Sequence, residues 1–244
     1  MTATVLPAAP HLAAMRRLQS LSPLDGLASA AIERAAVRSR RVERRAEVFR
    51  EGQDMHGGLL LLEGWTARIR QLPDGRRQLV SFGLPGDLLG YCQFDGARAS
   101  STMAAVTVVT ICHLPDPTLS PALTRAFAIS RALDEAYLIA HVTRLGRLNA
   151  HERLIDFLLE LYERLEPCGL TQAGRFLIPL TQEAIADALG LTPVHLNRTL
   201  QEARRNGEVT WTGREVTLHD PNAAAVAVGH TRARVCALPA PSGA

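Results

Sequence analysis

Short runs of hydrophobic residues, alternating with polar ones, mark the first half of the chain. A helical pattern comes first, beginning at Ser22-Pro23 and running to about Val37, with apolar residues three and four apart. The runs that follow lie at 46–49, 58–62, 65–69, 78–82 and 107–111. Glycine turns such as Glu63-Gly64 separate them. Strands of this length at spacings of about ten residues predict an antiparallel roll or sandwich.

Hydrophobic residues change to helical spacing between 120 and 148. One set of these residues recurs at the spacing of paired helices and consists of Ala126, Ile129, Leu133, Ala136, Ala140 and Thr143. A second apolar set, which includes Phe127 and Tyr137, lies beside it and can pack back onto the roll. We therefore expect a dimerisation helix with Ile129, Leu133, Ala136 and Ala140 at its interface. The alternative is a helix that packs only on its own roll.

Two further helices joined by one glycine follow between 180 and 205. Thr181 and Thr192 stand at the expected N-caps, and Pro193 suits the first position of the second helix. Gly190 provides the left-handed backbone that a short turn requires. The second helix has an apolar face of Leu196, Leu200 and Ala203 and a more polar face of Val194, Asn197, Arg198 and Gln201. This pattern predicts a helix-turn-helix whose second helix reads DNA, against the alternative of a plain helical hairpin.

A hairpin pattern follows the second helix. Asn206-Gly207 ends the helix, and the residues at 208–211 and 215–218 alternate around the turn Thr212-Gly213-Arg214. A hairpin in this place predicts the wing of a winged helix-turn-helix.

Two segments of the sequence carry a family resemblance. "LTQEAIADALGLTPVHLNRTLQEARRNGEVTWTGREVTLHD" resembles the DNA-binding domain of the Crp/Fnr family of bacterial transcription regulators. "GLLLLEGWTARIRQLPDGRRQLVSFGLPGDLLG" resembles the cyclic-nucleotide-binding-type β-roll of the same family. The resemblance implies an α+β fold: a jelly-roll-like antiparallel β-roll, a long dimerisation helix and a winged helix-turn-helix. The expected divisions are an arm at 1–20, the roll with its leading helix at 21–118, the dimerisation helix at 119–148, the DNA-binding domain at 149–222 and a flexible tail at 223–244.

The resemblance and the helix geometry together assign roles to the polar side chains. Arg198 matches the family's guanine-reading arginine, and its planar fork suits the O6 and N7 edge of guanine. Val194 stands where the family often has a glutamate, so we expect it to touch a thymine methyl, with Asn197 reading a neighbouring base. The further expected contacts, to phosphate or, for Gln201, to phosphate or base, are Thr181, Gln182, Thr192, His195, Gln201, Arg205 and Arg214.

The expected effector pocket departs from the family pattern, which uses Gly-Glu for the ribose and Arg-Ser for the cyclic phosphate. Here a tyrosine, Tyr91, follows the glycine, and Arg98 does not directly precede a serine. Cyclic AMP is therefore disfavoured, and we expect Tyr91, Phe94 and Met103 to fill the space. The residues assigned to this pocket are Gly90, Tyr91, Arg98, Ser100 and Ser101.

Other cofactors are disfavoured as well. The oxygen-sensing branch of the family holds an iron–sulfur cluster through several N-terminal cysteines, and no cysteine precedes Cys92. Met55, His56 and His11 are weak candidates for a haem ligand. No cofactor and no metal site are predicted. The four cysteines lack metal-ligand spacing, which suits a reducing cytosol.

Composition narrows the class of protein only slightly. The chain of 244 residues is 47% hydrophobic, enough for two modest domains, and its net charge of +3 says little about nucleic acid. No apolar run approaches the roughly 18 residues of a membrane span, and no signal peptide is evident, so we expect a cytoplasmic protein without membrane contact. Enzyme motifs are absent, and His56 and His113 do not form the cluster that a cupin-like metalloenzyme needs.

The sequence thus predicts a homodimeric transcription regulator, not an enzyme. Its expected partners are an inverted-repeat operator in double-stranded DNA, a second copy of the chain, and RNA polymerase. The alternative is a β-roll ligand-binding or protein-interaction module whose C-terminal helices do not read DNA.

Overall fold

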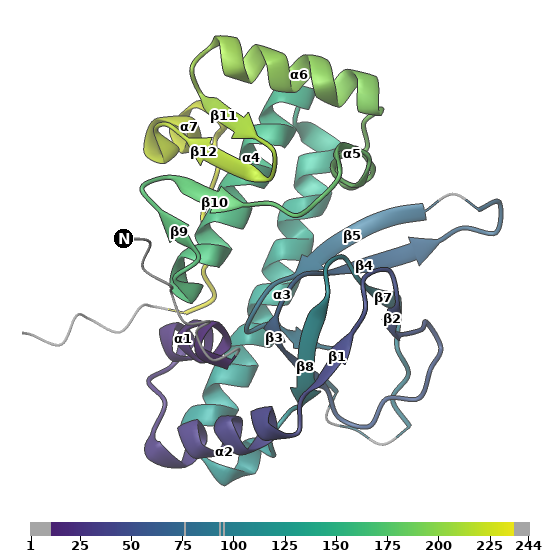
Figure 1. Cartoon of the computed structure of the whole chain (residues 1–244), viewed down its shortest axis with the longest axis vertical. Coiled ribbons are helices and arrows are strands. Elements are labelled where there is room, and N and C mark those ends of the chain that lie inside the picture. Colours follow the sequence, from purple (N-terminus) through teal and green to yellow (C-terminus); the bar gives the residue numbers. More distant parts are fainter. Residues whose placement is uncertain (1–10, 76, 93, 95, 237–244) are drawn as a thin grey trace, which may run out of the picture.

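Two antiparallel sheets build a β-roll in the computed structural model, which describes residues 11–75, 77–92, 94 and 96–236 (Figure 1). One sheet has the order β1-β8-β3-β6 and the other β2-β7-β4-β5. Leu61, Met103 and Ile111 are buried between them, which confirms the predicted roll. The strands are β1 (Arg40–Val42), β2 (Glu47–Phe49), β3 (Leu59–Glu63), β4 (Thr66–Gln71), β5 (Arg77–Gly83), β6 (Leu88–Leu89), β7 (Thr102–Ala105) and β8 (Val109–His113).

The first described helix, α1 (His11–Leu21), corrects the predicted N-terminal arm. Ala14 and Leu18 stand one turn apart and are fully buried. The helix packs against β3, the long helix α3 (Pro121–Arg147) and the short helix η2 (Glu166–Cys168). The small side chain of Ala14 allows this close packing. Residues 1–10 of the predicted arm lie outside the described residues. The next helix, α2 (Gly26–Val37), begins at its N-cap Asp25.

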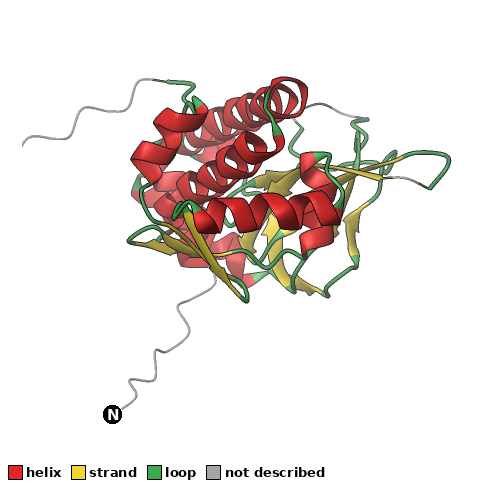
Figure 2. Cartoon of the chain, turned by 90° about the horizontal axis from the view of Figure 1, so that it is seen from above, coloured by secondary structure: helices red, strands yellow, loops and turns green. Residues whose placement is uncertain are grey.

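Two long helices cover one side of the roll: α3 (Pro121–Arg147) and α4 (Ala150–Leu165), preceded by the short helix η1 (Pro117–Leu119). Figure 2 shows the helices gathered on one side and the roll on the other. Ser120 caps α3, and Asn149 with Glu152 forms a capping box that starts α4. The two caps set where each of these helices begins, and so where the chain leaves the roll and where it turns from α3 into α4. Among the described residues, every helix is too short or too polar to span a bilayer.

The C-terminal domain is a winged helix-turn-helix, as predicted. Its helices are α5 (Gln182–Leu189) and α6 (Pro193–Arg205). Its strands are β9 (Thr171–Gln172), β10 (Arg175–Leu177), β11 (Val209–Thr212) and β12 (Glu215–Leu218), in a sheet of order β11-β12-β10-β9. One hydrophobic core runs from α4 through α5 and α6 to this sheet.

The helix α7 (Pro221–Val228) corrects the predicted flexible tail. Asp220 accepts a hydrogen bond from the Ala223 amide and so caps the helix, while the alanines that follow favour helix. The helix packs against α4. His230 beyond it is buried, with its side chain 7% exposed. Residues 237–244 of the predicted tail lie outside the described residues.

Candidate nucleic-acid interface

Local hydrogen bonds set the turn of the helix-turn-helix. The Thr181 hydroxyl accepts a hydrogen bond from the Ala184 amide at 3.1 Å, and the Thr192 hydroxyl accepts one from the His195 amide at 3.2 Å. Gly190 between the helices has φ +63°, in the left-handed region. Both threonine side chains are therefore N-caps, and each hydroxyl keeps a hydrogen that a phosphate oxygen could accept.

The two faces of α6 differ sharply in exposure. Leu196, Leu200 and Ala203 are buried on the face that packs against α4. Val194 is 81% exposed on the opposite side, where Asn197 and Arg198 are exposed too. An apolar inner face holds the helix in place, while the polar outer face remains free for a ligand.

The wing is attached to the end of the recognition helix. Arg204 donates a hydrogen bond to the Trp211 carbonyl of β11. The β11–β12 hairpin pairs Thr212 with Glu215 at its tip, and Arg214 is exposed there. The helix and the wing thus form one unit. Arg204 was not among the predicted site residues, because a single arginine near a helix end gives no pattern that marks such an anchor.

The predicted DNA contacts all lie at accessible positions, although their contacts with DNA stay a prediction. Eight of them are exposed: Thr181, Gln182, Thr192, Val194, Asn197, Arg198, Arg205 and Arg214. His195 and Gln201 are half-buried. Figure 1 shows α6 at the far end of the molecule from α2, with the β-roll on the other side of α5.

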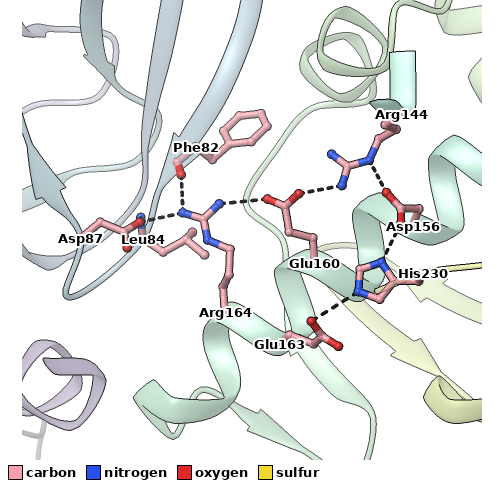
Figure 3. Close-up of polar contacts among 9 residues, drawn as sticks. All are labelled: Phe82, Leu84, Asp87, Arg144, Asp156, Glu160, Glu163, Arg164 and His230. Carbon is pink, nitrogen blue, oxygen red and sulfur yellow. Dashed lines mark hydrogen bonds and ion pairs between the residues drawn. The ribbon is translucent and has the colours of Figure 1, made fainter. Parts of the chain in front are cut away.

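A buried ionic network joins the DNA-binding domain to the roll (Figure 3). Arg164 of α4 donates to the Phe82 carbonyl and to the Asp87 carboxylate, both at 2.7 Å, and to Glu160 at 3.1 Å. Its guanidinium also stacks on the Tyr137 ring, 4.5 Å from the centroid. Although burial opposes the charged form, the neighbouring Asp87 and Glu160 charges raise the pKa of Arg164 above its ordinary value.

Arg144 continues the network from α3. It donates to Asp156 and to Glu160, each at 2.6 Å, so Glu160 lies between two arginines. Burial works against the charge of Arg144, but the two carboxylates outweigh it and raise the pKa of Arg144. Two carboxylates of α4 thus pair with one guanidinium of α3, which fixes α4 against α3.

His230 brings the C-terminal segment into the same network. Its Nδ1 lies 2.6 Å from Asp156 and its Nε2 3.3 Å from Glu163, the second as an ion pair without hydrogen-bond alignment. Burial lowers the affinity of the imidazole for a proton, but these carboxylates raise the pKa of His230 to about 9. The sequence predicts that this residue lies in a flexible tail, since a lone histidine in an Ala-rich segment gives no signal of a buried partner.

A second contact between the domains is more exposed. Arg77 of β5 lies 3.0 Å from the carboxylate of Asp187 on α5, and the Gln78 amide donates to the Asp187 carbonyl at 3.1 Å. The Arg77 and Asp187 side chains are 48% and 30% exposed, so solvent screens this pair.

The residues assigned to the effector pocket do not converge. Arg98 is exposed and pairs with Asp54 at 3.2 Å on the surface of the roll. Tyr91 packs edge-on against Phe127 of α3 at 5.7 Å. Gly90 is half-buried, Ser101 is buried and Ser100 is exposed.

The space between the sheets is filled by the chain itself. Met103 lies in the roll core with Leu61 and Leu89, as expected. Phe94 is 71% exposed and does not fill the roll, which corrects that part of the prediction. Among the described residues, no group of three His, Cys, Asp or Glu side chains could hold a metal ion.

The predicted interface residues of α3 lie partly against their own chain. Leu133 is only 7% exposed. Ile129 and Leu133 line a cavity beneath α1 and the C-terminal segment, and Ala136 and Ala140 are half-buried. The large apolar side chains that α3 exposes, among the described residues, are Ile139 and Val142, at 61% and 70% exposed.

Known proteins share both parts of this architecture. The cyclic nucleotide-binding domain matches residues 39–125, and the Crp-like helix-turn-helix domain matches residues 152–223. The nitrogen fixation regulation protein FixK of Bradyrhizobium diazoefficiens is 33% identical over 168 residues, which cover 66% of this chain and 69% of FixK. The transcriptional activatory protein AadR of Rhodopseudomonas palustris is 31% identical over 181 residues, 71% of this chain and 74% of AadR.

Solved structures agree with these matches in fold. The structure of FixK2 from Bradyrhizobium japonicum superimposes with a TM-score of 0.67 at 24% identity, covering 80% of this chain and 98% of FixK2. A Crp/Fnr-family regulator from Thermus thermophilus gives a TM-score of 0.61 at 20% identity, covering 80% of this chain and all of that one. A roll of this type followed by a long helix and a winged helix-turn-helix, matched in sequence by such relatives, places this chain in the Crp/Fnr family of DNA-binding transcription regulators.

Proposed function

We propose that this chain reads an inverted-repeat operator as a homodimer, through the outer face of α6. The observation that carries the proposal is the exposed Arg198 on a helix whose opposite face, including Leu200, is buried. A guanidinium fixed in this way can donate to the O6 and N7 atoms of one guanine in the major groove. Val194, at 81% exposed, supplies an apolar contact suited to a thymine methyl.

A two-fold dimer requires a face of α3 that the protomer leaves open. Such a face consists of Ala128, Ala132, Glu135, Ile139 and Val142, which recur four and three residues apart and are exposed except for the half-buried Ala132. It lies roughly 100° around the helix from the residues predicted from sequence. We propose this face as the interface, because Leu133 is already covered by its own chain.

The proposal does not include cyclic AMP or an iron–sulfur cluster as effector. A cyclic phosphate moved into the roll loses its water, and only a well-placed arginine with further donors offsets that loss. Arg98 is on the surface with Asp54 as its partner, and Met103 occupies the interior. RNA polymerase as a partner, and a cytoplasmic location where both it and DNA are found, complete the proposal.

Selection of binding sites from random double-stranded DNA with the full chain tests this function. We expect an inverted repeat whose half-sites are separated by about one helical turn, roughly 34 Å, each with an essential guanine. Salt-dependent binding without any base preference would contradict the proposal, because it would show only a general attraction to phosphate.

A further inference from the structure

A cavity of about 210 Å³ lies outside the roll, among α1, α3, the end of α4 and the C-terminal segment at 232–236. Among the described residues that line it, none belongs to a strand of the roll. Its walls are mixed: Leu21, Ile129 and Leu133 are apolar, while Arg17 brings a charge from α1. This space is therefore separate from the place where the resemblance put an effector.

Arg17 is the unusual member of this lining. It is only 4% exposed, yet within the described part of the chain its guanidinium has no hydrogen-bond or ion-pair partner. The other deeply buried arginines, Arg144 and Arg164, each hold two carboxylates. The guanidinium nitrogens of Arg17 line the cavity and are not sealed from solvent, so an anion that enters the cavity can reach them and form the charge-assisted hydrogen bond that the described residues do not supply.

The remaining charges around the cavity are mostly engaged elsewhere. Arg164 is held by Asp87 and Glu160, as described above. Arg232 pairs with Glu166 at 3.2 Å, and Glu163 pairs with His230. This leaves Arg17 inside and the exposed Arg234 at the rim for an incoming anion.

The size and the walls of the cavity limit the ligand. Its volume falls below the roughly 300–1,000 Å³ of pockets that hold drug-sized ligands, which excludes a dinucleotide or a haem. Glu163 also lines the cavity and would repel a doubly charged phosphate more strongly than a singly charged carboxylate. One guanidinium in the same lining as Leu21, Ile129 and Leu133 suits a single negative charge joined to a small apolar body.

We propose that this cavity binds a small amphipathic carboxylate, with its carboxylate on Arg17 and its hydrocarbon or aromatic part against Ile129 and Leu133. The site adjoins the corner of the roll that holds α4. A Cβ atom added to Gly86 in that corner would lie 2.5 Å from the Arg17 Cβ, so α1 touches the corner backbone directly. Asp87, the next residue, is the partner of Arg164. A ligand bound to Arg17 would therefore lie next to the Arg164–Asp87 contact, which holds the DNA-binding domain against the roll.

Titration calorimetry of the full chain with benzoate and with hexanoate tests the site. Benzyl alcohol lacks the charge and inorganic phosphate lacks the apolar body, so the two serve as matched probes. We expect at least one carboxylate to bind, one per chain, at micromolar to millimolar concentrations, and both control probes to bind at least about tenfold more weakly. Binding of neither carboxylate, or equally tight binding of phosphate, would overturn the proposal.

Three variants locate the binding. Arg17→Gln should raise the carboxylate Kd at least about tenfold, whereas Arg16→Gln, an exposed neighbour outside the cavity lining, should change it by about twofold at most. Ile129→Phe fills the cavity from the opposite wall and should weaken binding as well, which keeps the test decisive if Arg17→Gln does not fold. Unchanged affinity in either folded cavity variant would refute the site.

The cavity proposal rests on the proposed regulatory function in one respect only, namely that the bound carboxylate acts as an effector of DNA binding. Operator affinity of the unmodified chain, measured without any carboxylate, separates the two. Failed titrations with intact operator binding would refute the cavity alone, while loss of sequence-specific operator binding would refute the proposed function.

Discussion

The Arg164 guanidinium of α4 donates to the Asp87 carboxylate at the corner between β5 and β6 over 2.7 Å, across 77 residues of sequence. The same Asp87 oxygen accepts a hydrogen bond from the Leu84 amide and so shapes the corner itself. One carboxylate thus sets both the corner of the roll and the position of the helix that leads into the DNA-binding domain.

Arg164→Met should reduce the free energy of unfolding by about 3–5 kcal/mol, because it leaves Asp87 and Glu160 buried without their shared cation. Urea denaturation followed by circular dichroism measures the change. The matched control is Arg77→Gln, which removes the half-exposed contact between the same two domains and should cost about 0–1 kcal/mol. Equal losses in the two variants would show that the buried pair has no special role in joining the domains.

His230 predicts how stability depends on pH. Its pKa is raised from 6.5 to about 9 in the folded chain, so folding favours the protonated imidazole. The resulting stabilisation is complete below about pH 6.5 and disappears as the pH rises through 9. At 1.36 kcal/mol for each pKa unit, it amounts to about 3 kcal/mol.

Comparing the unfolding of the unmodified chain with that of His230→Gln between about pH 6 and pH 10 tests this dependence. The stability difference between the two should shrink steadily toward the alkaline end. His113→Gln, at an exposed strand end, is the control and should leave the pH dependence unaltered. A difference that stays constant with pH would mean that His230 contributes by packing and not by charge.

The proposed α3 interface makes a specific prediction about assembly. Val142→Glu places a charge on the exposed face of α3 and should yield folded monomers with weak operator binding. Leu133→Glu buries its charge inside the protomer and should instead lower the melting temperature. Sedimentation and thermal melts distinguish the two outcomes. If Val142→Glu stays dimeric while a folded Leu133→Glu dissociates, the interface predicted from sequence is the correct one.

Cyclic AMP should not act on this protein. Calorimetric titration of cyclic AMP and cyclic GMP should show no binding at micromolar concentrations, because Arg98 pairs with Asp54 on the outside of the roll. Micromolar binding that also tightens operator affinity would contradict this and would mean that Arg98 turns inward.

The elements that could be predicted from the sequence are those set by interactions between residues close together in the chain. Thr192, Pro193 and Gly190 act on their own backbone or their neighbours, so the helix-turn-helix could be recognised without any tertiary contact. The apolar run of β3 and the alternation in β12 likewise report buried faces directly.

The remaining features depend on which element lies against which. Along α3, both the Ile129–Leu133 set and the Ile139–Val142 set have helical spacing, and only the folded chain shows that Leu133 is covered and Val142 is open. The network of Arg164 and His230 joins residues far apart in sequence. On α4 the charged residues recur three and four apart, as they do on a helix face exposed to solvent. The sequence pattern therefore does not show which of these charges are buried.

The base preference of Arg198→Ala tests the central claim most directly. Affinities of the unmodified chain and the variant are measured on the selected operator and on versions with each base pair changed, at one fixed salt concentration. We predict a loss of roughly 1–3 kcal/mol and relaxed preference at a single guanine of each half-site. Arg214→Ala at the wing, as the control, should weaken all sequences alike and reduce the salt slope by about one. An Arg198→Ala protein that keeps the full base preference of the unmodified chain would contradict the account.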